Sequence, residues 1–70
     1  MPKKIRELKK LLRRAGFTMR PGKGSHTNWT HPKYAGRITL AGKDGRDAKP
    51  YQEQTILDAI QQVNEAKDNG

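Results

Sequence analysis

The first segment of the chain places its apolar residues at the spacing of an amphipathic helix. Successive members are separated by three, three, one and three positions, which puts them on one helical stripe and predicts a helix over residues 3–15. Gly16 suits the left-handed residue that ends many helices, and Phe17 directly after it can pack back onto Leu12. The stripe consists of Ile5, Leu8, Leu11, Leu12 and Ala15.

Three short segments that follow alternate polar and apolar residues, the pattern of strands with one buried face. We predict strands at residues 17–20, 26–31 and 37–40. A proline and two glycines predict a hairpin turn at 21–25, and a further glycine predicts a second turn at 33–36. The three strands would then form an antiparallel sheet joined by tight turns.

The last third of the chain contains a loop followed by a second amphipathic helix. Residues 41–49 lack periodicity and contain an Asp-Gly pair typical of a tight turn, so we predict a loop there. Pro50 suits a first helical turn, and we predict a helix over residues 51–66 with a frayed tail at 67–70. The apolar stripe of this helix consists of Ile56, Ala59, Ile60 and Val63.

These elements predict an α+β domain of order α-β-β-β-α, with a three-stranded antiparallel sheet and both helices on one face. The helical stripes are the only extended apolar surfaces available to cover the apolar face of the sheet. This topology is that of double-stranded-RNA-binding domains, and we expect residues 1–70 to form a single domain of this kind. Strand parity predicts that Phe17, Met19, Trp29, Ile38 and Leu40 point toward the helices, whereas Thr18, Arg20, His26, Asn28, Thr30, Arg37 and Thr39 point to solvent.

Composition alone argues against a stable fold. Leu, Ile, Val and Phe supply only 11 of 70 residues and the net charge is +8, values typical of disordered chains, but the periodic placement of the apolar residues outweighs this count. The absence of cysteine excludes disulfides and thiolate metal sites, and no apolar run is long enough to span a membrane. Since the start also lacks the apolar segment of a signal peptide, we expect a cytoplasmic protein. We expect no cofactor, because no cluster of Asp, Glu or His supplies four metal ligands.

Positive charge is concentrated in the first half of the chain. Residues 1–37 hold eleven Lys or Arg and one acidic residue, a balance of +10, whereas residues 38–70 hold four against six, a balance of −2. A field of that sign attracts polyanions, of which nucleic acid is the most common in a cell. The alternatives are a merely solvated cationic face and a membrane-surface helix, although the first helix lacks the bulky aromatic residues that such helices use.

Parity separates the two histidines. If Trp29 is buried, His26 three positions away points to water, while His31 falls on the side of Trp29 or at the strand end. The two rings should therefore not meet, which argues against a two-histidine metal site or acid–base pair. We interpret Trp29 as core rather than a base-stacking platform, His31 as structural, and Asp44 and Asp47 as turn residues rather than magnesium ligands.

An exposed histidine directly after a glycine-rich turn in a cationic region is a candidate for RNA cleavage. RNA carries its own nucleophile, the 2′-hydroxyl, so cleavage needs its deprotonation, charge stabilisation on the phosphate and protonation of the leaving oxygen. Imidazole exchanges protons near neutral pH, which makes His26 the candidate catalytic residue. The phosphate can be bound by Lys23, Gly24 and Ser25, with Arg20 beside them. The turn lacks the spacing of a Walker loop, and the simpler interpretation is a turn followed by a surface histidine.

Several segments together resemble the HicA (YcfA-like) toxin family. The strongest motif is Gly-Ser-His followed three residues later by an aromatic residue and, two after that, by His-Pro. The resemblance implies a double-stranded-RNA-binding-like fold, ribosome-independent cleavage of mRNA, His26 as the catalytic residue, and neutralisation by an acidic HicB antitoxin. Residues 41–50 depart from the family pattern, in which many members have a Pro- and His-containing segment there. The similar segments are 8–12, 15–17, 22–26, 29–32 and 37–40.

We therefore expect a metal-independent endoribonuclease toxin that cleaves mRNA, pairs with a HicB-like acidic antitoxin and is monomeric by itself. The first alternative is a non-catalytic binder of double-stranded RNA, although such domains grip phosphates with lysines at the start of the second helix, where this chain has Gln52 and Glu53. The second is a small basic adaptor that only binds an acidic protein partner. In the leading interpretation, flanking phosphates are held by Lys9, Lys10, Arg13 and Arg14 on the first helix.

Overall fold

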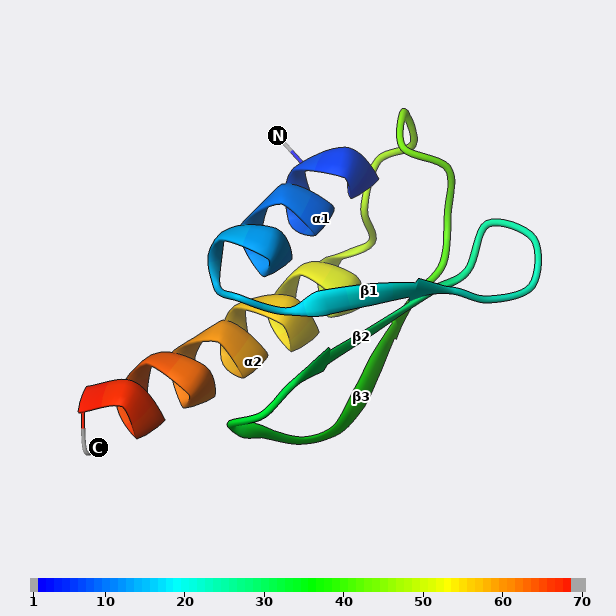
Figure 1. Cartoon of the computed structure of the whole chain (residues 1–70). Helices are drawn as coiled ribbons and strands as arrows, with labels where there is room; N and C mark the ends of the chain where they lie inside the picture. The colour runs from blue at the N-terminus through cyan, green and yellow to red at the C-terminus, as the bar shows by residue number, and fades with distance from the viewer. Residues whose placement is uncertain (1, 69–70) are drawn as a thin grey trace.

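The computed structural model describes residues 2–68 and contains two helices and three strands (Figure 1). The elements are α1 (Ile5–Arg14), β1 (Thr18–Pro21), β2 (Thr27–His31), β3 (Tyr34–Leu40) and α2 (Pro50–Asp68). The strands form one antiparallel sheet in the order β1-β2-β3, and both helices lie on the same side of it. This arrangement confirms the predicted α-β-β-β-α fold.

One hydrophobic core lies between the sheet and the two helices. The sheet contributes Trp29, Ile38 and Leu40, all at most 5% exposed. Eight of the eleven Leu, Ile, Val and Phe side chains are buried, each stabilising the fold by roughly 1.5–3 kcal/mol. The chain therefore folds despite its low apolar content, because the few apolar residues are nearly all placed in the core. The helices supply Ile5, Leu8, Leu12, Ile56, Ala59 and Val63.

The end of α1 confirms the stop predicted from Gly16. This residue has a φ of 93°, a left-handed conformation that side chains with a Cβ rarely adopt. Its N–H donates to the Arg13 carbonyl at 3.0 Å, and the Phe17 N–H donates to the Leu12 carbonyl at 3.0 Å. These two bonds form a Schellman motif, which turns the chain so that Phe17 enters the core.

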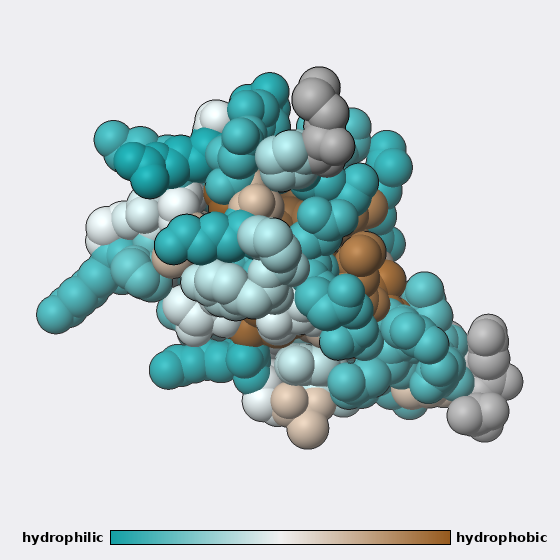
Figure 2. Space-filling model, turned by 180° about the vertical axis from the view of Figure 1, so that it is seen from behind, coloured by the Kyte–Doolittle hydropathy of each residue, from teal (hydrophilic) through white to brown (hydrophobic). Residues whose placement is uncertain are grey.

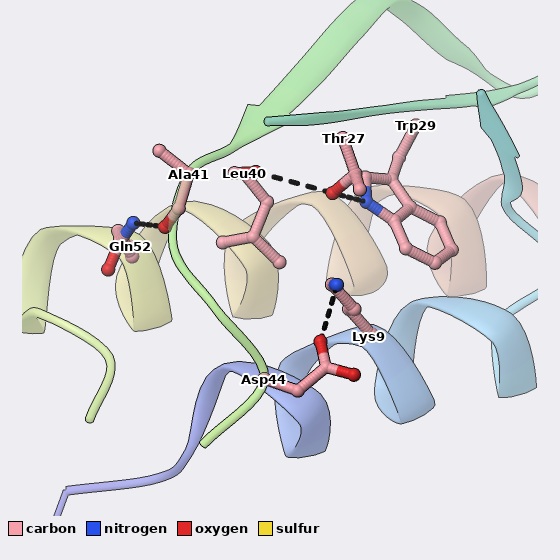
Figure 3. A network of polar contacts seen from close by, with 7 residues as sticks. All are labelled: Lys9, Thr27, Trp29, Leu40, Ala41, Asp44 and Gln52. Carbon is pink, nitrogen blue, oxygen red and sulfur yellow. Dashed lines mark hydrogen bonds and ion pairs between the residues drawn. The ribbon is translucent and has the colours of Figure 1, made fainter. Parts of the chain in front are cut away.

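Two consecutive hydrogen bonds link buried polar groups at the start of β2 to the end of β3 (Figure 3). The indole Nε1 of the fully buried Trp29 donates to Thr27 Oγ1 at 2.9 Å, and Thr27 Oγ1 donates in turn to the Leu40 carbonyl oxygen at 3.2 Å. Both polar groups thereby avoid the roughly 1–3 kcal/mol cost of burial without a partner. The burial of Trp29 confirms that it is a core residue and not a base-stacking platform.

The turn between β2 and β3 lies earlier than predicted. Tyr34 already pairs with His31, so Pro32 and Lys33 alone form the turn. The prediction of a turn at residues 33–36 is therefore wrong. His31 Nδ1 accepts the Lys33 N–H at 2.9 Å, which closes the connection. Gly36, with a φ of 82°, lies inside β3 beside a register shift of the ladder. Its glycine signal marks a strand irregularity rather than a turn.

Met19 is the one residue of the predicted inward set that is not buried. It pairs with Trp29 and so lies on the helix-facing side of the sheet, yet it is 39% exposed. Because β1 is an edge strand, Met19 has a neighbouring strand on one side only, and solvent reaches it from the other. The predicted orientation of Met19 toward the helices is therefore correct, although its side chain is not buried.

Helix α2 begins at Pro50, within the predicted first turn, and continues to Asp68. It therefore includes positions 67 and 68 of the predicted frayed tail, while positions 69–70 lie outside the described residues. Gln52 fixes the start of the helix, because its Oε1 accepts the Lys49 N–H at 2.8 Å. This is one half of a capping box, in which the third helical residue satisfies the N-cap amide.

The loop at 41–49 is attached to α1 by two ion pairs. Lys9 Nζ lies 2.5 Å from Asp44 Oδ1 (Figure 3), and Lys4 Nζ lies 2.5 Å from Asp47 Oδ1. The hydrogen bond and charge of Lys9 hold the pKa of the Asp44 carboxyl below its ordinary value of 3.8. The two aspartates were predicted as turn residues, and each in addition neutralises a lysine near the start of the chain.

Candidate functional site

His26 lies at the end of the hairpin between β1 and β2, and its side chain is exposed. The Gly22 N–H donates to the His26 carbonyl at 2.9 Å, and the His26 N–H donates to the Lys23 carbonyl at 2.9 Å. A Cβ at position 22 would lie 3.2 Å from Asn28 Nδ2 and 3.3 Å from the His26 carbonyl oxygen, so this close approach favours glycine. The backbone that carries the imidazole is therefore fixed on both sides.

The turn before His26 also orients its ring. His26 Nδ1 lies 3.0 Å from the Lys23 carbonyl oxygen. Since a carbonyl oxygen only accepts hydrogen bonds, this contact requires a proton on Nδ1, and Nε2 of the neutral ring then carries the lone pair. The ring thus presents a proton acceptor at Nε2 on an exposed surface, as a general base requires.

The outer face of the sheet beside His26 carries a row of polar side chains. Arg20 pairs with Asn28, and Asn28 pairs with Thr39, so the three side chains share one face across the three strands. Thr39 Oγ1 donates to Asn28 Oδ1 at 2.9 Å, while Asn28 Nδ2 lies near the hairpin at Gly22. This row places a guanidinium and an amide donor on the face to which His26 belongs.

The predicted orientation of the outward residues is confirmed, since six of the seven are exposed and Asn28 is half-buried. Asn28 and Thr39 were nevertheless not predicted as members of a site. Strand parity was enough to place Asn28 on the outer face. Its hydrogen-bond partner on β3 depends on the strand register, which contains a shift that the sequence does not reveal.

Lys23, Gly24 and Ser25 form the tip of the hairpin, and all three are exposed. Gly24 has a φ of 57°, and a Cβ added there would meet no heavy atom within 4 Å, so the backbone at this point faces open solvent. The Lys23 carbonyl connects the tip directly to the His26 ring. The residues predicted to bind the scissile phosphate therefore adjoin the residue predicted to be catalytic, with Arg20 on the neighbouring strand.

The four cations predicted on α1 lie apart from this hairpin, because α1 packs on the other face of the sheet (Figure 1). The Lys9 ammonium is paired with Asp44, and the Lys9 side chain is only 14% exposed. The Arg13 guanidinium carbon lies 5.4 Å from the centroid of the Trp29 ring, within cation–π distance. The exposed members of the set are Lys10, Arg13 and Arg14.

His31 lies at the opposite end of β2 from His26, a separation of five residues or about 16 Å along a strand. Its ring centroid is 5.1 Å from that of Phe17, and a Cβ at Gly16 would lie 3.2 Å from His31 Nε2. The half-buried ring therefore packs against the end of α1 and the turn that follows it. This confirms that the two histidines do not meet and supports a structural role for His31.

The face of the described residues that is seen from behind is mostly hydrophilic (Figure 2). Within residues 2–68, no three His, Asp or Glu side chains come together as candidate metal ligands. Neither α1 nor α2 combines the length and the hydrophobicity needed to cross a bilayer. Among the described residues, the large hydrophobic side chains that are exposed are Met19, Tyr51 and Leu57.

In a comparison with protein families, the chain matches the family described as HicA toxin of bacterial toxin-antitoxin. The match spans residues 5–63, from the start of α1 to the fourth turn of α2, and therefore includes every element of the sheet. Comparisons with curated proteins and with solved structures gave no match.

Proposed function

Because the chain belongs to the HicA toxin family of bacterial toxin–antitoxin systems, we propose that it is a metal-independent endoribonuclease that cleaves mRNA through His26. The observation that carries this proposal is the environment of the His26 ring. Nδ1 is bonded to the Lys23 carbonyl, which leaves Nε2 as a proton acceptor on an exposed, cationic hairpin. An imidazole placed in this way can act as a general base on a bound RNA strand.

In the proposed reaction, the RNA supplies the nucleophile. His26 Nε2 takes the proton of a 2′-hydroxyl while that oxygen attacks the adjacent phosphorus. The bond from phosphorus to the 5′-oxygen of the next nucleotide breaks, and this oxygen takes a proton from water. The imidazolium then returns its proton to solvent. The products are a 2′,3′-cyclic phosphate and a 5′-hydroxyl end.

The charge that develops on the phosphate requires fixed donors. We assign this role to the side chains of Lys23 and Ser25 and to the backbone N–H of Gly24, which are exposed at the hairpin tip beside His26. Arg20 holds a neighbouring phosphate, because a guanidinium can donate two parallel hydrogen bonds to phosphate oxygens.

The cations of α1 have a more distant role in this proposal. Lys10, Arg13 and Arg14 are exposed and attract the flanking part of the RNA through their long-range field. Lys9 contributes little to this field, because Asp44 lies 2.5 Å from its ammonium and offsets its charge.

Membership of a toxin–antitoxin family implies an antitoxin partner. We propose that the partner is a HicB-like acidic protein that covers the hairpin and its cations, because complementary charge speeds association and occludes the surface that binds RNA. In the absence of this partner, the toxin acts as a cytoplasmic monomer on mRNA.

The proposal is tested by incubating the purified chain and its His26→Ala variant with RNA in the presence of a chelator. The wild type is expected to cut the RNA, and the variant should cut roughly 10²- to 10⁴-fold more slowly because it lacks the proton carrier. Thr18→Ala, also an exposed residue on the outer sheet face, serves as the matched control and should cut at the wild-type rate. Equal rates for wild type and His26→Ala would refute the assignment.

The same experiment separates the non-catalytic alternatives. A duplex-RNA binder would shift RNA in a gel without cutting it, and a basic adaptor would not bind RNA even at low salt. The start of α2 does not favour the duplex binder, because Gln52 is buried and donates to the Ala41 carbonyl at 2.9 Å, and Glu53 follows it. Lysines are expected at this point of a duplex-binding domain.

A further inference from the structure

A cavity of about 190 Å³ lies between the 41–49 loop and the first turn of α2, outside the site described above. Pockets that hold drug-sized ligands measure about 300–1,000 Å³, so this one suits a small group and not a whole coenzyme. The residues that line it come from α1, the loop and α2. They include Ile5, Gly42, Arg46, Lys49, Tyr51 and Gln52.

The walls of this pocket are held rigidly. Gln52, 9% exposed, donates to the Ala41 carbonyl at 2.9 Å (Figure 3) and accepts the Lys49 N–H at 2.8 Å, so it joins the two sides of the pocket. Gly42 has a φ of 125°, and a Cβ there would lie 3.2 Å from Ile5 Cγ1. The backbone thus approaches the apolar floor as closely as a glycine allows, and the pocket exists before any ligand binds.

The chemical character of the lining matches a nucleotide. Tyr51, 65% exposed, offers an aromatic ring at the rim, and Ile5 offers an apolar floor. Arg46 and Lys49 add two positive charges, and neither has an ion-pair partner among the described residues. The one acidic residue of the lining is Asp47, whose carboxylate is neutralised by Lys4 at 2.5 Å. An aromatic ring beside cations is the combination with which proteins bind single-stranded RNA.

The pocket and His26 adjoin the same end of the sheet. Thr27 at the start of β2 pairs with Leu40 at the end of β3. His26 directly precedes Thr27 and Ala41 directly follows Leu40, so both residues lie at the same end of the sheet. Figure 1 shows the β1–β2 hairpin and the 41–49 loop diverging from this end. An RNA strand bound at the hairpin can therefore reach the pocket by passing around this end of the sheet, from its outer face to the side of the helices.

From these observations we infer that the pocket binds one nucleotide of single-stranded RNA next to the bond that is cut. The base stacks on Tyr51, and Arg46 and Lys49 hold the phosphate. The inference rests on the proposed RNA-cleaving function and adds to it a second point of attachment for the substrate. It also gives a role to the loop before α2, which carries both Arg46 and Lys49.

The test measures binding of a fluorescently labelled, unstructured oligoribonucleotide to the His26→Ala protein by anisotropy, so that the RNA stays intact. Adding Tyr51→Ala should weaken binding about 5- to 150-fold, because stacking of one base on an aromatic side chain is removed. Tyr51→Phe keeps the ring and should bind as before. Leu57→Ala, an exposed apolar residue of α2 outside the pocket, is the matched control and should also bind as before.

A second pair of substitutions tests the phosphate contact independently of Tyr51. Replacing Arg46 and Lys49 together by Gln should flatten the plot of log affinity against log salt by about 0.7 for each phosphate of a single strand that these cations no longer bind. Replacing Lys43, a cation of the same loop that does not line the pocket, should leave this slope unchanged. Thermal melting of each variant checks that the fold is retained.

The two proposals fail in different ways. Unchanged affinity in both Tyr51→Ala and the Arg46, Lys49 double variant would overturn the pocket inference, whatever the cleavage assay shows. If the wild type cuts no RNA while Tyr51→Ala still weakens binding, the pocket inference stands as an RNA-binding site and the nuclease proposal is refuted.

Discussion

The β1–β2 hairpin and helix α1 are both rich in positive charge, yet the fold uses their charges differently. On α1, the Lys9 ammonium is paired with Asp44, and the Arg13 guanidinium lies over the Trp29 ring. At the hairpin tip, Lys23 is exposed and its carbonyl orients the His26 ring. Lys9 and Arg13 of α1 thus help to hold the domain together, whereas Lys23 of the hairpin remains available to a ligand.

This difference shows what a count of charges along the sequence omits. The balance of +10 over residues 1–37 treats every cation there as equal. Two of them, Lys4 and Lys9, are neutralised by aspartates from the later, acidic half of the chain. The available positive charge is therefore displaced from the start of the chain toward the hairpin and the exposed side of α1.

The largest predicted effect concerns the residue that joins the two regions. Trp29 is fully buried in β2 beneath Arg13 of α1, so Trp29→Ala should lower the free energy of unfolding by about 3–5 kcal/mol. Trp29→Phe keeps most of the volume, so it should lower the free energy of unfolding by less. The loss that remains comes mainly from the missing hydrogen bond to Thr27. Urea denaturation followed by circular dichroism measures both. A loss below about 1 kcal/mol in Trp29→Ala would contradict the description of Trp29 as the centre of the core.

An intermediate effect separates the two regions directly. In the His26→Ala background, Lys23→Ala should weaken RNA binding and lower the salt slope by about 0.7, the value for one phosphate that is no longer neutralised. Lys9→Met should leave the slope nearly unchanged, because its charge is already offset by Asp44, and should instead lower the melting temperature. Anisotropy titrations at several salt concentrations give the slopes. Equal slopes for the two variants would remove the distinction between hairpin and helix.

The smallest predicted effect is a pH dependence of stability at Asp44. Lys9 lowers the pKa of this carboxyl in the folded state, so the folded protein binds fewer protons there than the unfolded chain. The stabilisation is fully present above the ordinary value of 3.8 and is lost as the pH falls through the folded pKa. Asp44→Asn should therefore be less stable than wild type at neutral pH, and this difference should shrink in acid. Thermal melts of wild type and Asp44→Asn at neutral pH and across the acidic range measure this difference. A difference in melting temperature that stays constant with pH would contradict the role of the ion pair.

The parts of the fold that follow from local signals could be predicted from the sequence. The residue types of Gly16 and Phe17 predict the end of α1. The expected burial of Trp29, combined with strand parity, predicts that His26 points outward. Met19 shows the limit of parity, because alternation gives the side of the sheet but not the position of β1 at its edge. Gly36 shows the ambiguity of glycine, which marks irregular strands as well as turns.

The parts of the site that depend on distant pairs could not be predicted. Lys9 and Asp44 are 35 residues apart, and nothing local indicates that they meet. The Thr39 bond to Asn28 depends on the register of β3, and the pocket combines residues from α1, the 41–49 loop and α2. Each requires the tertiary arrangement, whereas the Gly-Ser-His motif is contiguous and visible in the sequence.

The most direct test of the account is single-turnover cleavage of one oligoribonucleotide and of its fully 2′-O-methylated counterpart, by wild type and by His26→Ala, with the product ends identified by mass spectrometry. The account predicts cyclic phosphate ends from the unmodified RNA with the wild type, and intact strands in the other three combinations over the same time. Cleavage of the methylated strand, or cyclic ends formed at the wild-type rate without the imidazole, would contradict it.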